Sequence, residues 1–192
     1  MSTTKRLWLG LGALLVASFA VMLWLGGDLF RTKPPIPERV VTTTGEVVYT
    51  RDDIQRGQVV WQSMGGMQLG SIWGHGALVA PDWSADWLKR EALALLDQDA
   101  LAATGKPYAA LDAAEQAKLR AILQPRQRRN TYDPASGDLV VDAARARAIA
   151  GVAAHYESLF SSDPATAGLR ETYAMKDDTV ADAGNRRALT AF

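Results

Sequence analysis

The sequence contains no cysteine among its 192 residues. Without thiols, the chain forms no disulfide, holds no iron–sulfur cluster or thiolate-bound zinc, and attaches no c-type haem covalently. It also lacks an excess of charge of either sign, since 21 lysine and arginine residues balance 21 aspartate and glutamate residues. Charge therefore gives no reason to expect nucleic acid as a partner. Motifs of serine hydrolases and phosphate-binding loops are also missing, so independent hydrolytic catalysis has no support.

What the sequence does have is a long uncharged segment near its start, from Leu7 to Gly27. As a helix, this segment covers about 30 Å, the thickness of the hydrocarbon core of a bilayer. Trp8 and Trp24 lie near its two ends, where indole rings prefer the membrane interfaces. Lys5 and Arg6 precede it, and the positive-inside rule places such residues in the cytoplasm. Residues 1–30 are therefore predicted to be a tail and a transmembrane helix, with the rest of the chain on the extracytoplasmic side.

A cleaved signal peptide is the alternative for this segment, because it also begins with basic residues followed by an apolar stretch. The uncharged run is longer than the usual signal core, and no small-x-small cleavage pattern follows Leu25, so a retained anchor is favoured. A cleaved peptide would instead release a secreted binding domain. Residues 31–39, which include Pro34, Pro35 and Pro37, are predicted to be a stiff proline-rich spacer.

The remaining sequence predicts a mainly helical domain with small β-hairpins. Two β-branched runs around Thr44-Gly45 predict one hairpin from Val40 to Thr50, and a Pro/Gly turn predicts short extended pieces between Tyr132 and Val141. Pro125 is expected to stop the third helix, before a solvated basic end. The predicted helices run from Thr50 to residues 64–66, from Ser84 to Asp97, from Asp112 to Leu123 and from Asp142 to Phe160.

One stretch carries a resemblance to a known family. The segment GQVVWQSMGGMQLGSIWGHGALVAPDWSADWLKREAL, residues 57–93, resembles the extracytoplasmic domain of quinol-dependent nitric oxide reductases, of the haem-copper oxidase superfamily. KPPIPERVVTTTGE at residues 33–46, LRETYAMKDDTV at 169–180 and RRALTAF at 186–192 also match that family. The resemblance implies a cytochrome c-like domain without haem over residues 40–180. Residues 181–192 would lead into a second transmembrane helix that lies beyond this sequence.

The family comparison also locates the place of the lost haem. The haem-bearing subunit of the related cytochrome c-dependent enzymes has a Gly-x-x-x-Trp helix, a Cys-x-x-Cys-His motif and a glycine-rich loop. Gly57 and Trp61 match the helix, residues 76–81 match the loop, and residues 66–70 replace the haem motif without any thiol or imidazole. The resemblance therefore implies the outline of a cytochrome c without its cofactor.

A core that has lost a haem needs other atoms in the same volume, because protein interiors are close-packed. Four bulky side chains near the missing motif are predicted to fill it: Trp61, Met64, Met67 and Trp73. The alternative is that these residues are ordinary core or surface residues, unrelated to a lost haem.

Few residues are candidates for a site. His75 and His155 show no spacing that would bring their rings together, and lone histidines are more often structural. The family resemblance implies a calcium ion held by the carbonyl of Gly76 and by a tyrosine two residues later, but Leu78 stands at the tyrosine position. Gly76 is thus the one metal-ligand candidate. The alternative is that glycine is needed at this position only for the backbone angles that it permits.

The acidic residues between positions 82 and 91 do not form a catalytic pair. Asp82 precedes a predicted helix, Asp86 lies in its first turn, and Glu91 follows in the same helix. Interaction of the first two with the helix dipole explains their position. We therefore assign no catalytic residue and no cofactor-binding residue.

The resemblance implies a role in denitrification at the bacterial inner membrane. The complete enzyme would reduce two nitric oxide molecules to nitrous oxide and water with electrons from quinol, using two b haems, non-haem iron and calcium. Because those haems and the iron belong to a later membrane helix bundle, this chain is expected to be its N-terminal anchor and periplasmic cover, structural rather than catalytic. Its partners would be that bundle, the lipid bilayer and quinol. The alternative is an independent single-pass membrane scaffold or assembly subunit.

Overall fold

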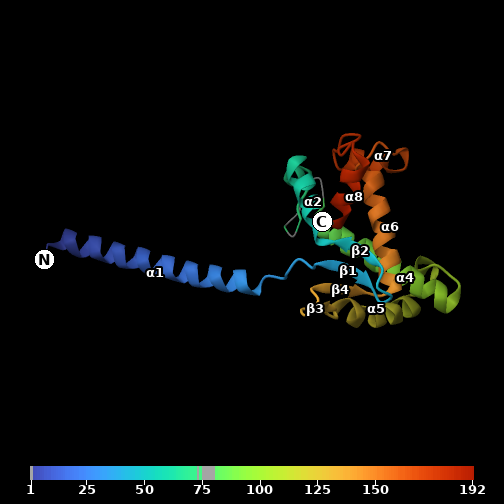
Figure 1. Ribbon diagram of the computed structural model, residues 1–192, viewed down its shortest axis with the longest axis horizontal. Coiled ribbons are helices and arrows are strands. Elements are labelled where there is room, and N and C mark those ends of the chain that lie inside the picture. The colour runs from blue at the N-terminus through green and yellow to red at the C-terminus, as the bar shows by residue number, and fades with distance from the viewer. Residues whose placement is uncertain (1, 73, 75–80) are drawn as a thin grey trace. The chain divides into compact units, whose positions relative to one another are not determined.

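The computed structural model describes residues 2–72, 74 and 81–192. The chain divides into two compact units, Met1–Ile36 and Pro37–Phe192, which are treated separately below. Figure 1 shows the helices and strands of both. The mainly helical fold with a small sheet is as predicted.

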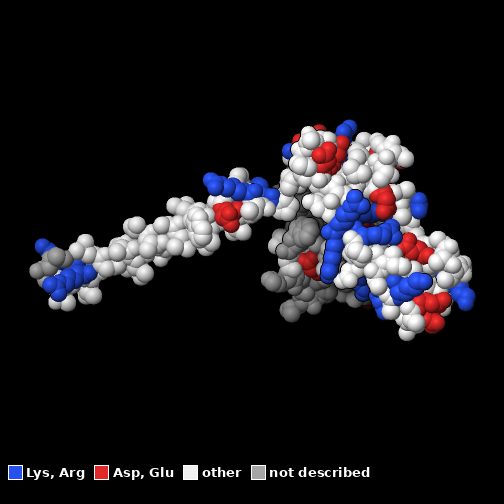
Figure 2. All heavy atoms as spheres, turned by 90° about the horizontal axis from the view of Figure 1, so that it is seen from below, with Lys and Arg blue, Asp and Glu red and all other residues white. Residues whose placement is uncertain are grey.

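The first unit is a single apolar helix, α1, from Thr3 to Thr32. None of its residues is buried, and Figure 2 shows it uncharged between charged residues at its two ends. By length and composition alone it is long and apolar enough to cross a membrane, a test that signal sequences also pass. The helix ends at Thr32, two residues beyond the predicted boundary, because Lys33 precedes Pro34 and so takes an extended conformation. The predicted spacer is correspondingly shorter, since the first strand begins at Arg39.

The second unit contains a four-stranded sheet built from the two predicted hairpins. Strands β1 (Arg39–Thr42) and β2 (Val47–Thr50) pair antiparallel, as do β3 (Tyr132–Asp133) and β4 (Asp138–Val141). The hairpins join through a parallel pairing of β1 with β4, which gives the strand order β2-β1-β4-β3. Arg39 lies opposite Asp138 in this pairing, and its guanidinium donates two hydrogen bonds to that carboxylate at 2.7 and 3.0 Å. A bidentate ion pair therefore marks the junction of the two hairpins.

The helices of this unit follow the predicted local signals at three of their starts. Thr50 forms a capping box with Asp53 at the first predicted start, Asp112 forms one with Glu115 at the third, and Asp142 caps the fourth predicted helix. The helices are α2 (Arg51–Ser63), α3 (Gly66–Leu69), α4 (Trp83–Thr104), α5 (Ala113–Arg128), α6 (Ala143–Leu159), α7 (Ala167–Thr172) and α8 (Ala183–Ala191), with 3-10 turns at Tyr108–Ala110 and Pro164–Thr166.

Helix α4 differs from its prediction at both ends. Its cap is Asp82 rather than Ser84, because the Asp82 carboxylate accepts a hydrogen bond from the Ala85 N–H at 3.0 Å. The helix also continues past the predicted end at Asp97 to Thr104. Gly105 ends it in a left-handed conformation with φ of 70°, which glycine adopts at little cost.

Pro125 does not stop α5, contrary to prediction, and the helix runs on to Arg128. Proline removes only the hydrogen bond to the carbonyl of Ala121, a residue that is exposed and can be hydrated. Arg126 holds the last turn in place through ion pairs with Asp99 at 2.8 Å and Asp142 at 3.5 Å. Arg126, which belongs to the basic end predicted to be solvated, therefore forms ion pairs with neighbouring parts of the domain instead.

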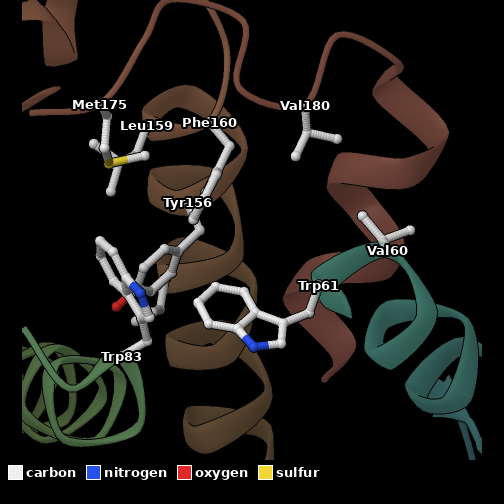
Figure 3. Packing of buried hydrophobic residues seen from close by; sticks show 9 residues of the cluster. Val60, Trp61, Trp83, Tyr156, Leu159, Phe160, Met175 and Val180 are labelled. Carbon is white, nitrogen blue, oxygen red and sulfur yellow. The ribbon is translucent and has the colours of Figure 1, made fainter. Parts of the chain in front are cut away.

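The main core lies between α2, α4, α6 and α8. Figure 3 shows Trp61 from α2, Trp83 from α4 and Tyr156 from α6 facing the same interior. Trp83 contacts Tyr156 edge-on, with ring centroids 6.0 Å apart. A second cluster, which includes Leu95 and Leu123, joins α4, α5 and α6. The sheet contributes a third, around Val141.

Helices α2 and α8 pack closely against each other at Gly57. A Cβ atom at this position would overlap the carbonyl oxygen of Ala188 and lie 2.8 Å from the Cβ atom of Phe192. Ala188 and Thr190 are both buried, so residues 181–192 form part of this compact unit. Their predicted role as a lead-in to a further membrane helix stays a prediction.

The crossing at Gly57 generates a stability prediction. Gly57→Ala should lower the free energy of unfolding by about 1–3 kcal/mol, because the added methyl group must displace backbone of α8. The control is Gly151→Ala in α6, where nothing lies within 4 Å of an added Cβ atom, and this change should raise stability by about 0.5–1 kcal/mol. Urea unfolding of the full chain in detergent, followed by near-ultraviolet circular dichroism, measures both. Equal effects of the two substitutions would contradict a close crossing.

Candidate functional site

The only predicted metal ligand cannot be placed. Trp73, His75, Gly76 and Leu78 all lie outside the described residues. The calcium ligand at Gly76 therefore stays a prediction. Within the part of the chain that is described, no group of three histidine, aspartate or glutamate side chains is arranged to hold a metal ion.

A pocket of about 250 Å³ opens among the sheet, α2, α4, α6 and α8. Most of its described lining is aromatic or aliphatic, and four further lining residues, on α4, α6 and α8, are polar or charged. The aromatic lining residues are Tyr49, Trp61, Trp83, Trp87, Tyr156, Phe160 and Phe192. The polar ones are Ser84, Glu91, Arg145 and Thr190. This pocket is the candidate site, because ligand sites are concave and largely apolar with few polar groups.

The prediction for the side chains that replace the haem is partly wrong. Trp61 is buried and lines the pocket, and Met64 packs against the same core. Met67, however, is 72% exposed and so fills no interior volume. Trp73 lies outside the described residues.

Three aromatic residues that the sequence reasoning missed occupy the core instead. Trp83, Tyr156 and Phe160 are all nearly buried, and the ring centroids of Trp83 and Phe160 are 5.7 Å apart. A signal for two of them was present, since residues 156 and 160 are one helical turn apart and share a face of the predicted helix. Nothing local, by contrast, indicates that Trp83 packs on that face.

A buried carboxylate lies in the wall of the pocket. Glu91 is 2% exposed, and Arg145 Nε donates a hydrogen bond to its Oε1 at 2.6 Å. Trp87 Nε1 donates to its Oε2 at 3.3 Å. Both carboxylate oxygens therefore have a donor, and the positive charge of Arg145 balances the negative charge of Glu91. The sequence had suggested no such partner for Glu91.

A second polar cluster ties α4 to α6 beside the pocket. The hydroxyl of Tyr156 donates to Asp86 Oδ2 at 2.7 Å, and Arg90 Nε donates to the same oxygen at 2.6 Å. Burial and then the hydrogen bond to Asp86 raise the pKa of Tyr156 far above its usual range. Tyr156 is therefore a neutral hydrogen-bond donor rather than a base. Asp86 also does more than interact with the helix dipole, since it binds two partners on different helices.

Asp82 has the structural role that its position suggested. Its carboxylate accepts hydrogen bonds from the N–H groups of Ala85 and Gly74 and from the hydroxyl of Ser71, at 2.8 to 3.0 Å. Burial alone would raise the pKa of Asp82, but these hydrogen bonds outweigh it and lower that pKa. The residue joins the start of α4 to the preceding loop.

His155 lies on α6, away from the pocket lining. Its ring meets Tyr156 edge-on at 5.4 Å, and its Nε2 atom is buried without a hydrogen-bond partner in the described chain. No histidine or methionine occurs among the described residues that line the pocket. The described lining therefore lacks the histidine and methionine side chains that ligate the iron of c-type haems.

Comparison with known proteins adds a family. A family model for the NorB cytochrome c-like domain of nitric oxide reductase matches residues 37–192. This range coincides with the second compact unit. No curated protein matches the chain.

The environment of His155 generates a prediction for pH dependence. Burial, and then the charge of Arg90, lower the pKa of His155, while Asp86 opposes them. The unfolded chain, where the pKa is about 6.5, then binds a proton more readily than the folded chain. The free energy of unfolding should therefore fall as pH drops from about 7 to 5, and His155→Gln should remove part of that fall. Urea titrations at several pH values measure the free energy of unfolding of both proteins. If this free energy falls as steeply with pH in the variant as in the unchanged chain, the proposed role of His155 is refuted.

Proposed function

This chain belongs to the family of the NorB cytochrome c-like domain of nitric oxide reductase, and we propose that it is the N-terminal anchor and extracytoplasmic domain of a quinol-dependent nitric oxide reductase. The observation that carries this proposal is the family match, which spans the whole compact unit from residue 37 to residue 192. In the complete enzyme, two nitric oxide molecules would be reduced to nitrous oxide and water.

The anchoring role rests on α1. An apolar helix with no buried residue gains most by entering a bilayer, where every backbone polar group is already bonded within the helix. Lys5 and Arg6 before the helix favour a cytoplasmic N-terminus. The domain that follows would then lie in the periplasm, attached to the bacterial inner membrane.

The domain's role is structural rather than catalytic. The sequence has no thiol for covalent haem, and the described pocket residues include no histidine or methionine to ligate haem iron. Electron transfer and the chemistry would belong to the membrane helix bundle, with its two b haems, non-haem iron and calcium. This chain would anchor and cover the extracytoplasmic face of that bundle, near which quinol is oxidised. Close packing of aromatic rings lets the domain keep its shape without a cofactor.

Membrane topology tests the anchoring role. Alkaline phosphatase fused after Phe192 should be active in bacterial cells, because it needs the periplasm to form its disulfides. Green fluorescent protein fused at the same place should stay dark, while the same protein fused before Met1 should fluoresce. The mass of the mature product should include α1. An inactive phosphatase, or a product that begins after Gly27, would contradict the proposed anchor.

Absorption spectroscopy tests the absence of haem from this domain. The full chain, purified in detergent from cells that make haem, should show no Soret band, because the sequence has no thiol and the described pocket lining has no histidine or methionine for iron. A c-type cytochrome produced in the same strain serves as the positive control. Haem in a stoichiometric amount would overturn the structural role assigned to the domain.

An independent single-pass scaffold or assembly subunit is the second candidate. It is favoured by one observation, namely that α8 packs against α2 as part of the compact unit. The DNA downstream of the codon for Phe192 separates the two candidates. A nitric oxide reductase predicts an open reading frame that continues into long apolar helices with histidines, whereas a scaffold predicts a stop codon.

A further inference from the structure

We propose that the pocket binds one neutral, flat aromatic molecule of one or two fused rings that carries a hydrogen-bond-accepting oxygen at its edge. The pocket is the one defined above by its lining on the sheet, α2, α4, α6 and α8. The proposal does not rest on the proposed function, since it follows from the size, shape and charge of the pocket alone.

Size sets the first limit on the ligand. A cavity of about 150 Å³ in a protein core is known to hold benzene, whereas pockets for drug-sized molecules have roughly 300–1,000 Å³. The volume of about 250 Å³ lies between these values. It therefore suits a ring system somewhat larger than benzene.

The arrangement of the aromatic walls sets the shape. The rings of Trp87 and Tyr156 are stacked, with centroids 5.5 Å apart and an angle of 11° between their planes. Trp83 stands nearly perpendicular to Tyr156, at 78°. A flat ring can thus meet one wall face to face and another edge to face, the two geometries that aromatic pairs prefer.

Charge sets the polarity of the ligand. The ion pair of Glu91 with Arg145 gives the wall no net charge, so a charged ligand would lose its hydration without gaining a counter-ion. Arg145 uses Nε for Glu91, and its terminal nitrogens make no hydrogen bond to the described chain. Because its side chain is 30% exposed, those donors remain available to an oxygen on a bound ring. A phenol or a ring carbonyl supplies that oxygen without adding charge.

Titration calorimetry with three probes tests the proposal on the full chain in detergent. 2-Naphthol has the proposed size and oxygen, naphthalene lacks the oxygen, and 2-naphthoate adds a negative charge. We expect one molecule of 2-naphthol to bind each chain, and binding of the other two to be weaker by about tenfold or more. Tighter binding of 2-naphthoate would overturn the inferred preference for a neutral ligand. Equal binding of naphthalene would overturn the role of the oxygen.

Two matched variants locate the binding and exclude simple partition into the micelle. Leu88 and Leu101 both lie on α4 and are both 48% exposed, but only Leu88 lines the pocket. Leu88→Trp should fill the mouth and weaken 2-naphthol binding by about tenfold or more, whereas Leu101→Trp should leave it unchanged. Circular dichroism checks that both variants are folded. Equal binding by the two variants would refute the site, and so would the absence of binding by the unchanged chain. In that case the pocket would instead be a docking site for a side chain of another polypeptide.

Discussion

The close approach of α2 and α8 at Gly57 is the constraint on which the rest of the domain depends. These helices come from opposite ends of the compact unit, and the backbone of Ala188 occupies the space where a side chain at position 57 would lie. One turn after Gly57, Trp61 enters the core, and one residue after Ala188, Leu189 reaches the same pocket. A wider separation of the helices would therefore also move both residues away from the pocket. A glycine at a helix crossing thus decides the dimensions of the interior.

Polar contacts between α4 and α6 give this apolar interior its orientation. Dispersion forces alone are non-directional and would allow the two helices to slide or rotate against each other. Asp86 and Glu91 both lie on α4, and each binds a residue of α6, Tyr156 and Arg145 respectively. Because a buried carboxylate without its donor is costly, each bond strongly disfavours a shifted register. Each of the two stacked rings is held by one of these carboxylates, since Tyr156 donates to Asp86 and Trp87 donates to Glu91.

Sequence reasoning succeeded where the determining contact is local. The capping boxes at Thr50 and Asp112 were predictable because each partner lies three residues away. The parallel pairing of β1 with β4 was not, because Arg39 and Asp138 are far apart in sequence and each hairpin is complete by itself. The same distinction holds at the site. The family motif placed Trp61 correctly, whereas the exposure of Met67 and the burial of Trp83 depend on how distant helices pack. For Pro125, the local rule was outweighed by distant ion pairs on the adjacent arginine.

A fold that resembles a cytochrome c but has no covalent haem must solve a packing problem, because a large empty interior is unstable. Of the side chains predicted to solve it, Trp61 is buried and lines the pocket, whereas Met67 points to solvent and Met64 reaches only the edge of the core. Further aromatic rings in this core come from α4 and from α6 with its C-cap, at positions 83, 156 and 160. A pocket of about 250 Å³ remains among these rings, and its apolar walls and neutral ion pair make it a place for a small uncharged molecule.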